Sequence, residues 1–269
     1  MVASKVLHAE QVPCFVHLWN VIVLVEIGGR PYAAHMDEGK DLSLPVRNLN
    51  GGIRAFGLGP VEIEPFRVPG FTGSVKEGGS ANCDLLSFYP HGNCTHTESI
   101  GHITPEQQSV NSIFSRYWFS AALVSIEPEL RGEDRVISKA QLEAMSLPKA
   151  EALIVRTLPN AADKKERNYT DSNPPYFEPA ALAWAADRGF QHLLCDLPSV
   201  DRESDGGRMA AHKAWWCYPE QPRFDASITE LIYVPEEIPD GFYLLNLQVA
   251  PVESDAAPSR PVLYSLRPL

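Results

Sequence analysis

Prolines and glycines limit the length of the regular elements in this chain. Its 269 residues include 23 prolines and 18 glycines, which end or interrupt helices and strands. Between them lie short apolar runs with the length and composition of buried strands. These runs are residues 122–126, 152–157, 192–197, 228–234, 242–250 and 260–266. The pattern therefore predicts many strands and few long helices.

Three segments carry helix signals. Residues 138–145 begin with a serine that is followed three positions later by glutamine, the spacing of a capping box. Residues 178–189 have proline near the start and glycine at the end, and residues 207–216 form a third candidate. Because strands and helices alternate in the middle and strands dominate both ends, we expect a mixed α/β fold with a sizeable sheet.

The composition excludes several classes of function. With 23 basic and 34 acidic residues the formal charge is −11, and an acidic surface repels phosphate backbones, so we expect no nucleic-acid partner. The five cysteines are scattered, odd in number and free of CxxC pairs, which indicates a reducing, cytoplasmic location. No GxSxG, GxxxxGK[ST], GxGxxG or HExxH motif occurs, so nucleophilic-serine and nucleotide chemistry lack local support.

The longest apolar run covers residues 15–27. It contains His17, Asn20 and Glu26 and is shorter than the roughly 20 residues of a membrane helix. We therefore expect a buried strand or short helix here, and no membrane partner.

Three of the eight histidines fall within residues 90–103. Even spacing places His96, Glu98 and His102 on one face of an extended chain. Two imidazoles and a carboxylate that converge from a strand and its following turn can bind zinc, manganese or iron. The alternative is a histidine-rich surface loop without metal.

Two neighbours of this cluster are open to more than one interpretation. In a regular strand His91 faces the other side, and only a bulge at Gly92 would bring it to the cluster. Cys94 is a candidate ligand, but a lone thiol is more often a small packed residue.

Two further candidates lie later in the chain. Glu230 shares its strand parity with Ile228, so it is buried if that face is the core, and a buried carboxylate must be paired or metal-bound. If the other face is buried, Glu230 is solvated. His212 lies on an apolar helical face and is either a packed core residue or an acid/base group.

The segment 92–102, GNCTHTESIGH, resembles the motif HxGTHxDxPxH of the cyclase family of metal-dependent hydrolases, which includes bacterial kynurenine formamidase and isatin hydrolase. Thr95, His96 and His102 match the motif, and Glu98 stands where the family has aspartate. The departures are Gly92 in place of the first histidine, with His91 one position earlier, Cys94 in place of glycine and Ile100 in place of proline.

Other segments resemble the same family in the same order. They are residues 40–46, 152–157, 176–201, 210–216, 228–231 and 244–266. The resemblance covers about residues 38–267. It implies an N-terminal extension over 1–37 and a cyclase-like domain over 38–269, which would be a single swivelling β/β/α-type α/β domain around a mixed β-sheet.

The resemblance also implies roles for individual residues. It implies a metal site, with His212 as the acid/base group beside the metal, and Ser199 and Asp201 near the substrate pocket or supporting the site. The implied metal ligands are His96, Glu98, His102 and Glu230, with His91 as the candidate replacement for the first histidine.

The implied activity is hydrolysis of a C–N bond in an aryl formamide, amide or lactam by a water that one or two zinc or manganese ions activate. We expect a small, aromatic substrate, walled by aromatic residues of the N-terminal region and of residues 169–177, in a homodimer or higher homo-oligomer. The alternative is a degenerate member of the family with little or no metal that binds a small molecule.

Overall fold

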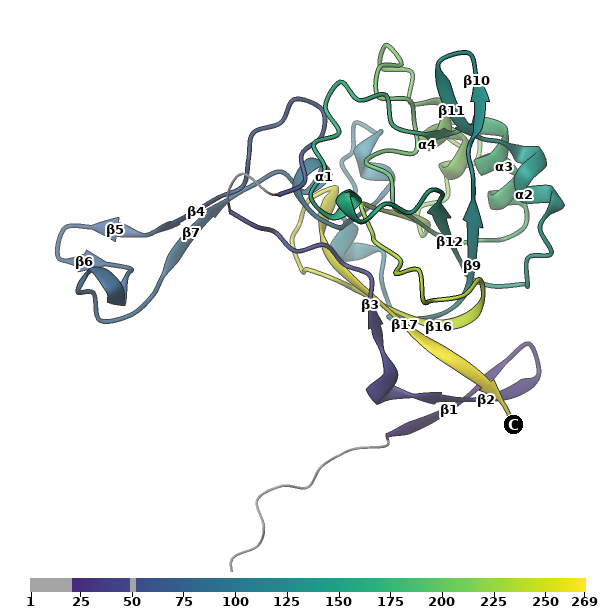
Figure 1. The fold of residues 1–269 in the computed structure, drawn as a ribbon, viewed down its shortest axis with the longest axis horizontal. Helices are drawn as coiled ribbons and strands as arrows, with labels where there is room; N and C mark the ends of the chain where they lie inside the picture. The colour runs from purple at the N-terminus through teal and green to yellow at the C-terminus, as the bar shows by residue number, and fades with distance from the viewer. Residues whose placement is uncertain (1–20, 49–51) are drawn as a thin grey trace, which may run out of the picture.

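The computed structural model describes residues 21–48 and 52–269. Its centre is a mixed sheet in which β8 pairs with both β15 and β17, so that seven strands close into a barrel (Figure 1). Around the barrel the order is β17-β16-β9-β12-β14-β15-β8. The strands are β8 (His96–Glu98), β9 (Trp118–Ile126), β12 (Ala152–Thr157), β14 (His192–Cys195), β15 (Ser227–Glu230), β16 (Gly241–Val249) and β17 (Ala256–Pro268).

The parallel strands β9, β12, β14 and β15 are buried on both faces. Alternate residues of β9 enter two different cores: Val124 packs with the helices, whereas Leu123 packs on the opposite face. The first of these cores lies between the sheet and three helices, which are α2 (Lys139–Ala144), α3 (Pro179–Asp187) and α4 (Ala210–Trp216). Burial on both faces explains why these strands are continuous apolar runs, and the predicted mixed α/β fold is confirmed.

The helix signals are also confirmed. Ser138 accepts the backbone N–H of Gln141, and the Gln141 side chain accepts the N–H of Ser138, which completes the capping box of α2. Pro179 begins α3. Gly189, just past the end of α3, has φ +86°, a conformation that favours glycine.

The predicted strand 228–234 is wrong in its second half. β15 ends at Glu230, and Leu231 has φ +55°, which turns the chain. As a result Ile228 packs with the helices, whereas Ile232 packs on the opposite face.

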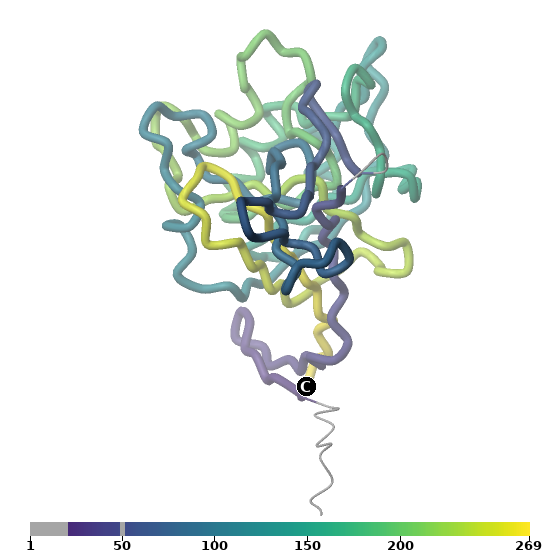
Figure 2. The backbone as a smooth tube through the Cα atoms, turned by 90° about the vertical axis from the view of Figure 1, so that its left-hand side faces the viewer, coloured from purple at the N-terminus to yellow at the C-terminus, as the bar shows by residue number. Residues whose placement is uncertain are grey.

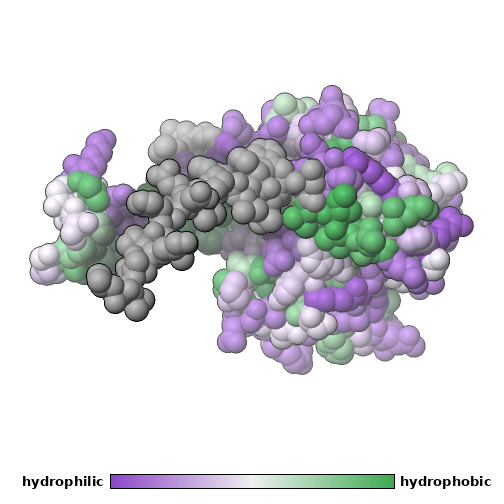
Figure 3. Space-filling view, turned by 90° about the horizontal axis from the view of Figure 1, so that it is seen from below, coloured by the Kyte–Doolittle hydropathy of each residue, from purple (hydrophilic) through white to green (hydrophobic). Residues whose placement is uncertain are grey.

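The apolar run at residues 15–27 differs from expectation where the structure describes it. Residues 15–20 lie outside the described residues, and β1 (Ile22–Ile27) is a strand whose side chains are largely exposed, Leu24 by 68%. Figure 3 shows apolar side chains on the face where this hairpin lies. β1 pairs with β2 (Arg30–His35), which pairs with the end of β17. The hairpin therefore extends beyond the barrel, and within residues 21–48 and 52–269 most side chains of β1 are exposed.

A second hairpin forms an arm that projects from the barrel (Figure 1) and faces the viewer in Figure 2. It consists of β4 (Glu62–Pro65) paired with β7 (Asp84–Ser87), and of β5 (Arg67–Val68) paired with β6 (Phe71–Thr72).

The remaining strands are short. β3 (Lys40–Asp41) pairs with β17, and β10 (Glu129–Arg131), β11 (Asp134–Ile137) and β13 (Tyr176–Phe177) form a separate small sheet. Within residues 21–48 and 52–269, no helix has the length and apolarity needed to cross a membrane.

Candidate metal centre

The pairing of β8 with β15 brings together two candidates that are far apart in the chain. The antiparallel register places His96 opposite Glu230, and His96 Nε2 lies 3.4 Å from Glu230 Oε2. Glu230 is only 3% exposed, and its Oε1 accepts the backbone N–H of Val200 at 2.9 Å. Because both faces of β15 are buried, Glu230 is buried as one of the two sequence interpretations required, although neither interpretation had expected the opposite face to be buried as well.

Glu98 lies at the centre of the cluster and is fully buried. His91 Nδ1 lies 3.2 Å from its Oε2, and His212 Nε2 lies 3.2 Å from its Oε1. His102, from the 3-10 turn that follows β8, places its Nε2 3.8 Å from Oε2. Three histidine rings from different segments thus surround one carboxylate.

His91 joins this cluster by a route that the sequence did not indicate. The bulge at Gly92 that would have turned His91 toward the cluster does not occur, because residues 90–93 form the short helix α1 (Pro90–Asn93), which begins at its proline. The helical turn, rather than a bulge, directs His91 toward Glu98. Gly92 serves a different purpose from the one expected: a Cβ there would lie 2.8 Å from the Leu58 side chain.

The most buried histidines are each fixed by one ring nitrogen. His96 Nδ1 bonds the carbonyl of Cys94 at 3.1 Å, and His212 Nδ1 bonds Asp201 Oδ2 at 2.6 Å. Asp201 also accepts the N–H of Ala211 at 2.7 Å, at the start of α4. In both rings Nε2 is left to face the carboxylates, the arrangement typical of metal-binding histidines.

Several buried polar atoms of the cluster have no hydrogen-bond partner among the described residues. They are Nε2 of His96 and of His212 and both carboxylate oxygens of Glu98. Buried polar groups are normally satisfied, because leaving them unpaired is costly. Nitrogen and carboxylate oxygen are the donors that zinc and manganese accept, so the residues present fit a divalent cation.

Two sets of side chains could each hold an ion. One is His96, Glu98 and Glu230, and the other is His91, Glu98 and His102; within each set the ligand atoms lie within 4.8 Å of one another. Glu98 belongs to both sets, so its two oxygens could serve two ions.

The carboxylates dominate the electrostatics of the site. Burial disfavours the charged form of His91, but the hydrogen bond to Asp255 and the nearby carboxylate of Glu98 outweigh it and raise the pKa of His91 to about 10. Burial of His212 is likewise outweighed by Asp201 and Glu98, which raise its pKa to about 10. Burial opposes ionisation of Glu98, yet His102 and His212 hold its pKa well below the ordinary value. Protons balance this negative charge when no cation does, so cation binding would release protons.

Sequence reasoning missed Asp255. Its Oδ2 lies 3.0 Å from His91 Nε2 and 3.1 Å from His102 Nδ1. The residue precedes β17 in a loop without periodicity, and it reaches the cluster only because β17 pairs with β8. No local signal in the sequence could have identified it.

A cavity of about 270 Å³ opens onto the cluster. His91, His102, His212 and Glu230 line it, together with Ser199 and Asp201, the two residues that were expected near the site. The other lining residues are Phe56, Pro198, Arg202, Glu203, Asp205 and Met209.

Residues 169–177 do not line this cavity within the single chain, since Phe177 is buried in the core and Tyr169 packs beneath the surface; an aromatic wall from a dimer partner stays a prediction. The aromatic residue that lines the cavity is Phe56, which has the unusual φ of +59°. Strained backbone of this kind is found most often at functional sites.

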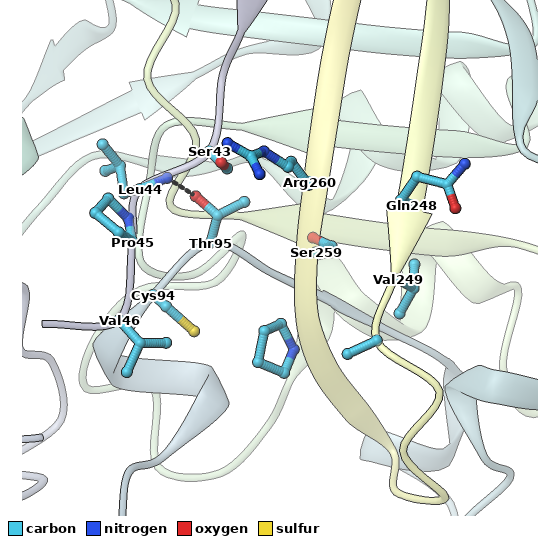
Figure 4. A pocket seen from close by; sticks show the side chains of 12 residues that line it. Ser43, Leu44, Pro45, Val46, Cys94, Thr95, Gln248, Val249, Ser259 and Arg260 are labelled. Atoms are coloured by element: carbon cyan, nitrogen blue, oxygen red, sulfur yellow. Dashed lines mark hydrogen bonds between the residues drawn. The ribbon is translucent and has the colours of Figure 1, made fainter. Parts of the chain in front are cut away.

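A larger cavity of about 430 Å³ lies elsewhere (Figure 4). Its lining includes Leu44, Cys94, Thr95 and Arg260, and it includes none of the cluster's histidines or glutamates. Cys94 is only 1% exposed and belongs to neither set of side chains that could hold an ion. Cys94 is therefore a packed residue, as the more frequent role of a lone thiol suggested.

Comparisons with known proteins agree with this geometry. A search of the solved structures gave a potential metal-dependent hydrolase with cyclase activity (TM-score 0.62, 15% identity, covering 84% of this chain and 97% of the other). It also gave a predicted metal-dependent hydrolase from Bacillus stearothermophilus, with a TM-score of 0.59 and 15% identity over 84% of this chain and 98% of the other. A third match is isatin hydrolase A from Labrenzia aggregata bound to benzyl benzoate, with a TM-score of 0.58 and 12% identity over 84% of this chain and 93% of the other. At these identities the likeness shows the fold.

A comparison with curated proteins found no match. The family model described as "Putative cyclase" matches residues 40–202, more than half of the chain. The protein therefore belongs to this cyclase family.

Proposed function

We propose that the protein is a metal-dependent hydrolase that cleaves the C–N bond of a small aryl formamide, amide or lactam. The observation that carries this proposal is the buried Glu98, surrounded by histidine nitrogens, with both oxygens lacking a hydrogen-bond partner in the described part of the chain. Isatin hydrolase among the structural neighbours supports the lactam class.

The cluster would hold one or two zinc or manganese ions. His96, Glu98 and Glu230 would bind the first ion together with His212, whose Nε2 faces both carboxylates. The other oxygen of Glu98 would share the second ion with His91, beside His102. A bound divalent cation supplies water activation near neutral pH and polarises a carbonyl oxygen.

His212 and His102 differ in burial, and this difference suggests which of them binds the metal and which transfers a proton. The His212 side chain is only 2% exposed and its Nε2 faces Glu98 and Glu230, at 3.2 and 3.9 Å, so it suits a metal ligand that Asp201 orients. The His102 side chain is 26% exposed and lines the cavity, so it can reach a substrate. We therefore assign proton transfer to the leaving nitrogen to His102 and metal binding to His212, the reverse of the roles that the resemblance implied.

The cavity suggests the kind of substrate. Phe56 and Met209 offer apolar surface beside the histidines, so a flat aromatic group would pack there while its carbonyl faces the cluster. A homodimer and a cytoplasmic location stay predictions; light scattering of the purified protein tests the first.

Metal analysis combined with an activity screen tests the proposed function. Purified protein should contain zinc or manganese, and the His96→Ala and Glu230→Ala variants should lose it together with activity on N-formylkynurenine, isatin-like lactams or aryl formamides. Matched controls are His35→Ala and Glu253→Gln, which change the same residue types outside the site and should keep the metal. Protein that takes up no metal even after reconstitution would instead be the metal-free binding member of the family.

A further inference from the structure

We infer that Asp255 is a positioning residue that fixes the ring orientation and tautomer of both His91 and His102. The geometric part of this inference stands by itself, and its consequence for catalysis rests on the proposed function. One carboxylate would then control both a metal ligand and the group that transfers the proton.

The contacts of Asp255 allow one protonation pattern. Its Oδ2 lies 3.0 Å from His91 Nε2 and 3.1 Å from His102 Nδ1, while Oδ1 accepts the hydroxyl of Ser254 at 3.0 Å. An ionised carboxylate can only accept hydrogen bonds. Each histidine must therefore donate from the nitrogen that faces Asp255.

The opposite nitrogens of the two rings face the cluster. His91 Nδ1 lies 3.2 Å and His102 Nε2 3.8 Å from Glu98 Oε2. Each ring thus contacts Glu98 through one nitrogen and Asp255 through the other. Asp255 therefore lies behind the rings, on the side away from the candidate metal position. With the proton kept on the Asp255 side, the lone pair of His91 Nδ1 is free for a cation and that of His102 Nε2 is free to accept a proton.

These two rings need such an anchor more than the others do. The His91 and His102 side chains are 25% and 26% exposed at the edge of the cavity, whereas packing on every side holds His96 and His212. A half-exposed ring without a fixed partner can rotate and exchange its nitrogens. Groups that orient a metal-binding histidine in this way typically change metal affinity 10–100-fold when removed.

The backbone makes Asp255 a stable anchor. Its carbonyl accepts the N–H of Ser99 at 2.9 Å, and the following residue, Ala256, pairs with Glu98 in the β17–β8 ladder. The ladder that carries Glu98 thereby also fixes the distance from Asp255 to the two rings.

Asp255→Asn tests the inference with little change of shape. Nitrogen-15 NMR of histidine-labelled, zinc-loaded protein should show His91 Nε2 and His102 Nδ1 protonated in the wild type, and both signals should shift in the variant. Zinc affinity, measured by calorimetry, should fall 10–100-fold, and kcat should fall more than KM rises. The matched control is Glu253→Gln, which removes a carboxylate from an exposed position in the same loop.

The outcomes separate this inference from the proposed function. Unchanged nitrogen signals together with a zinc affinity equal to that of Glu253→Gln would overturn the role of Asp255. If the wild type binds neither zinc nor manganese, the proposed function fails. The change of the same two signals between wild type and Asp255→Asn in metal-free protein then still decides whether Asp255 bonds both rings. If Asp255→Asn does not fold, Ser254→Ala supplies the test, because it frees Oδ1 alone and should weaken zinc binding by a smaller factor; a zinc affinity equal to that of the wild type would then count against the anchor.

Discussion

Glu98→Asp tests how one carboxylate serves the whole cluster. The oxygens of Glu98 lie 3.2 Å from nitrogens of both His91 and His212. Removing one methylene withdraws the carboxylate by about 1.5 Å, one C–C bond, so a 3.2 Å contact lengthens to as much as roughly 4.7 Å. Since a carboxylate oxygen binds zinc at about 2.0–2.2 Å, the shortened side chain cannot reach ions on both sides.

The substitution also restores the aspartate that the related motif carries. In this chain the histidine is displaced by one position to His91, and we interpret the longer Glu98 as the matching change. We expect Glu98→Asp to weaken the second equivalent of zinc at least tenfold, or about 1.4 kcal/mol, because even groups behind the ligands contribute 10–100-fold. Loss of a buried methylene should lower the free energy of unfolding by about 1 kcal/mol.

Zinc titration calorimetry and metal analysis of wild type, Glu98→Asp and Glu98→Gln provide the assay. Glu98→Gln keeps the reach and removes the charge, so it should weaken every equivalent, whereas Glu98→Asp should spare the first. Two equivalents of zinc at wild-type affinity in Glu98→Asp would refute the idea that the length of this side chain is adapted to the displaced histidine.

Three further predictions concern stability. Chelation should lower the melting temperature of the zinc-loaded wild type but not of His96→Ala, because a ligand at 100 times its Kd stabilises by about 2.7 kcal/mol; scanning calorimetry measures both. Burial lowers the pKa of His192 from 6.5 to about 3, so the unfolded chain binds this proton more readily and stability falls as the pH drops below 6.5. The loss is about 1.4 kcal/mol at pH 5.5, and urea unfolding should show it diminished in His192→Asn; parallel pH profiles would contradict this. Lys164→Met should lower the free energy of unfolding by about 3–5 kcal/mol, because Lys164 Nζ lies 2.8 Å from the fully buried Asp196; a loss below 1 kcal/mol, roughly that of a surface pair, would be inconsistent with the burial.

The sequence predicts the strands well because of how they are buried. Each strand of the parallel half packs on both faces, so its residues form a continuous apolar run that local reasoning can detect. The same reasoning predicted burial of β1 and was wrong there, because its apolar residues lie beyond the closed barrel and are mostly exposed. An apolar run in the sequence predicts that a strand forms, but it does not predict whether another layer of the fold covers that strand.

The candidate site was predictable where one element carries it. Even spacing indicated His96 and Glu98, which lie on one strand, whereas strand parity left open whether Glu230 is buried or solvated. His91 escaped the periodicity because a helical turn replaces the strand. Asp255 escaped it because its place depends on pairing between segments far apart in the chain, and no local pattern records that pairing.

The pairing that closes the barrel also assembles the candidate site. β8 has three residues, too few to be stable alone, and it is held by β15 on one side and β17 on the other. The first ladder places Glu230 opposite His96. The second pairs Ala256 with Glu98, which brings the preceding residue, Asp255, beside His91 and His102. Because both ladders fix this backbone, the positions of His96, Glu98 and Glu230 do not depend on the residues at which the segment departs from the motif it resembles. Side-chain length and one helical turn then suffice to return a displaced histidine to the cluster.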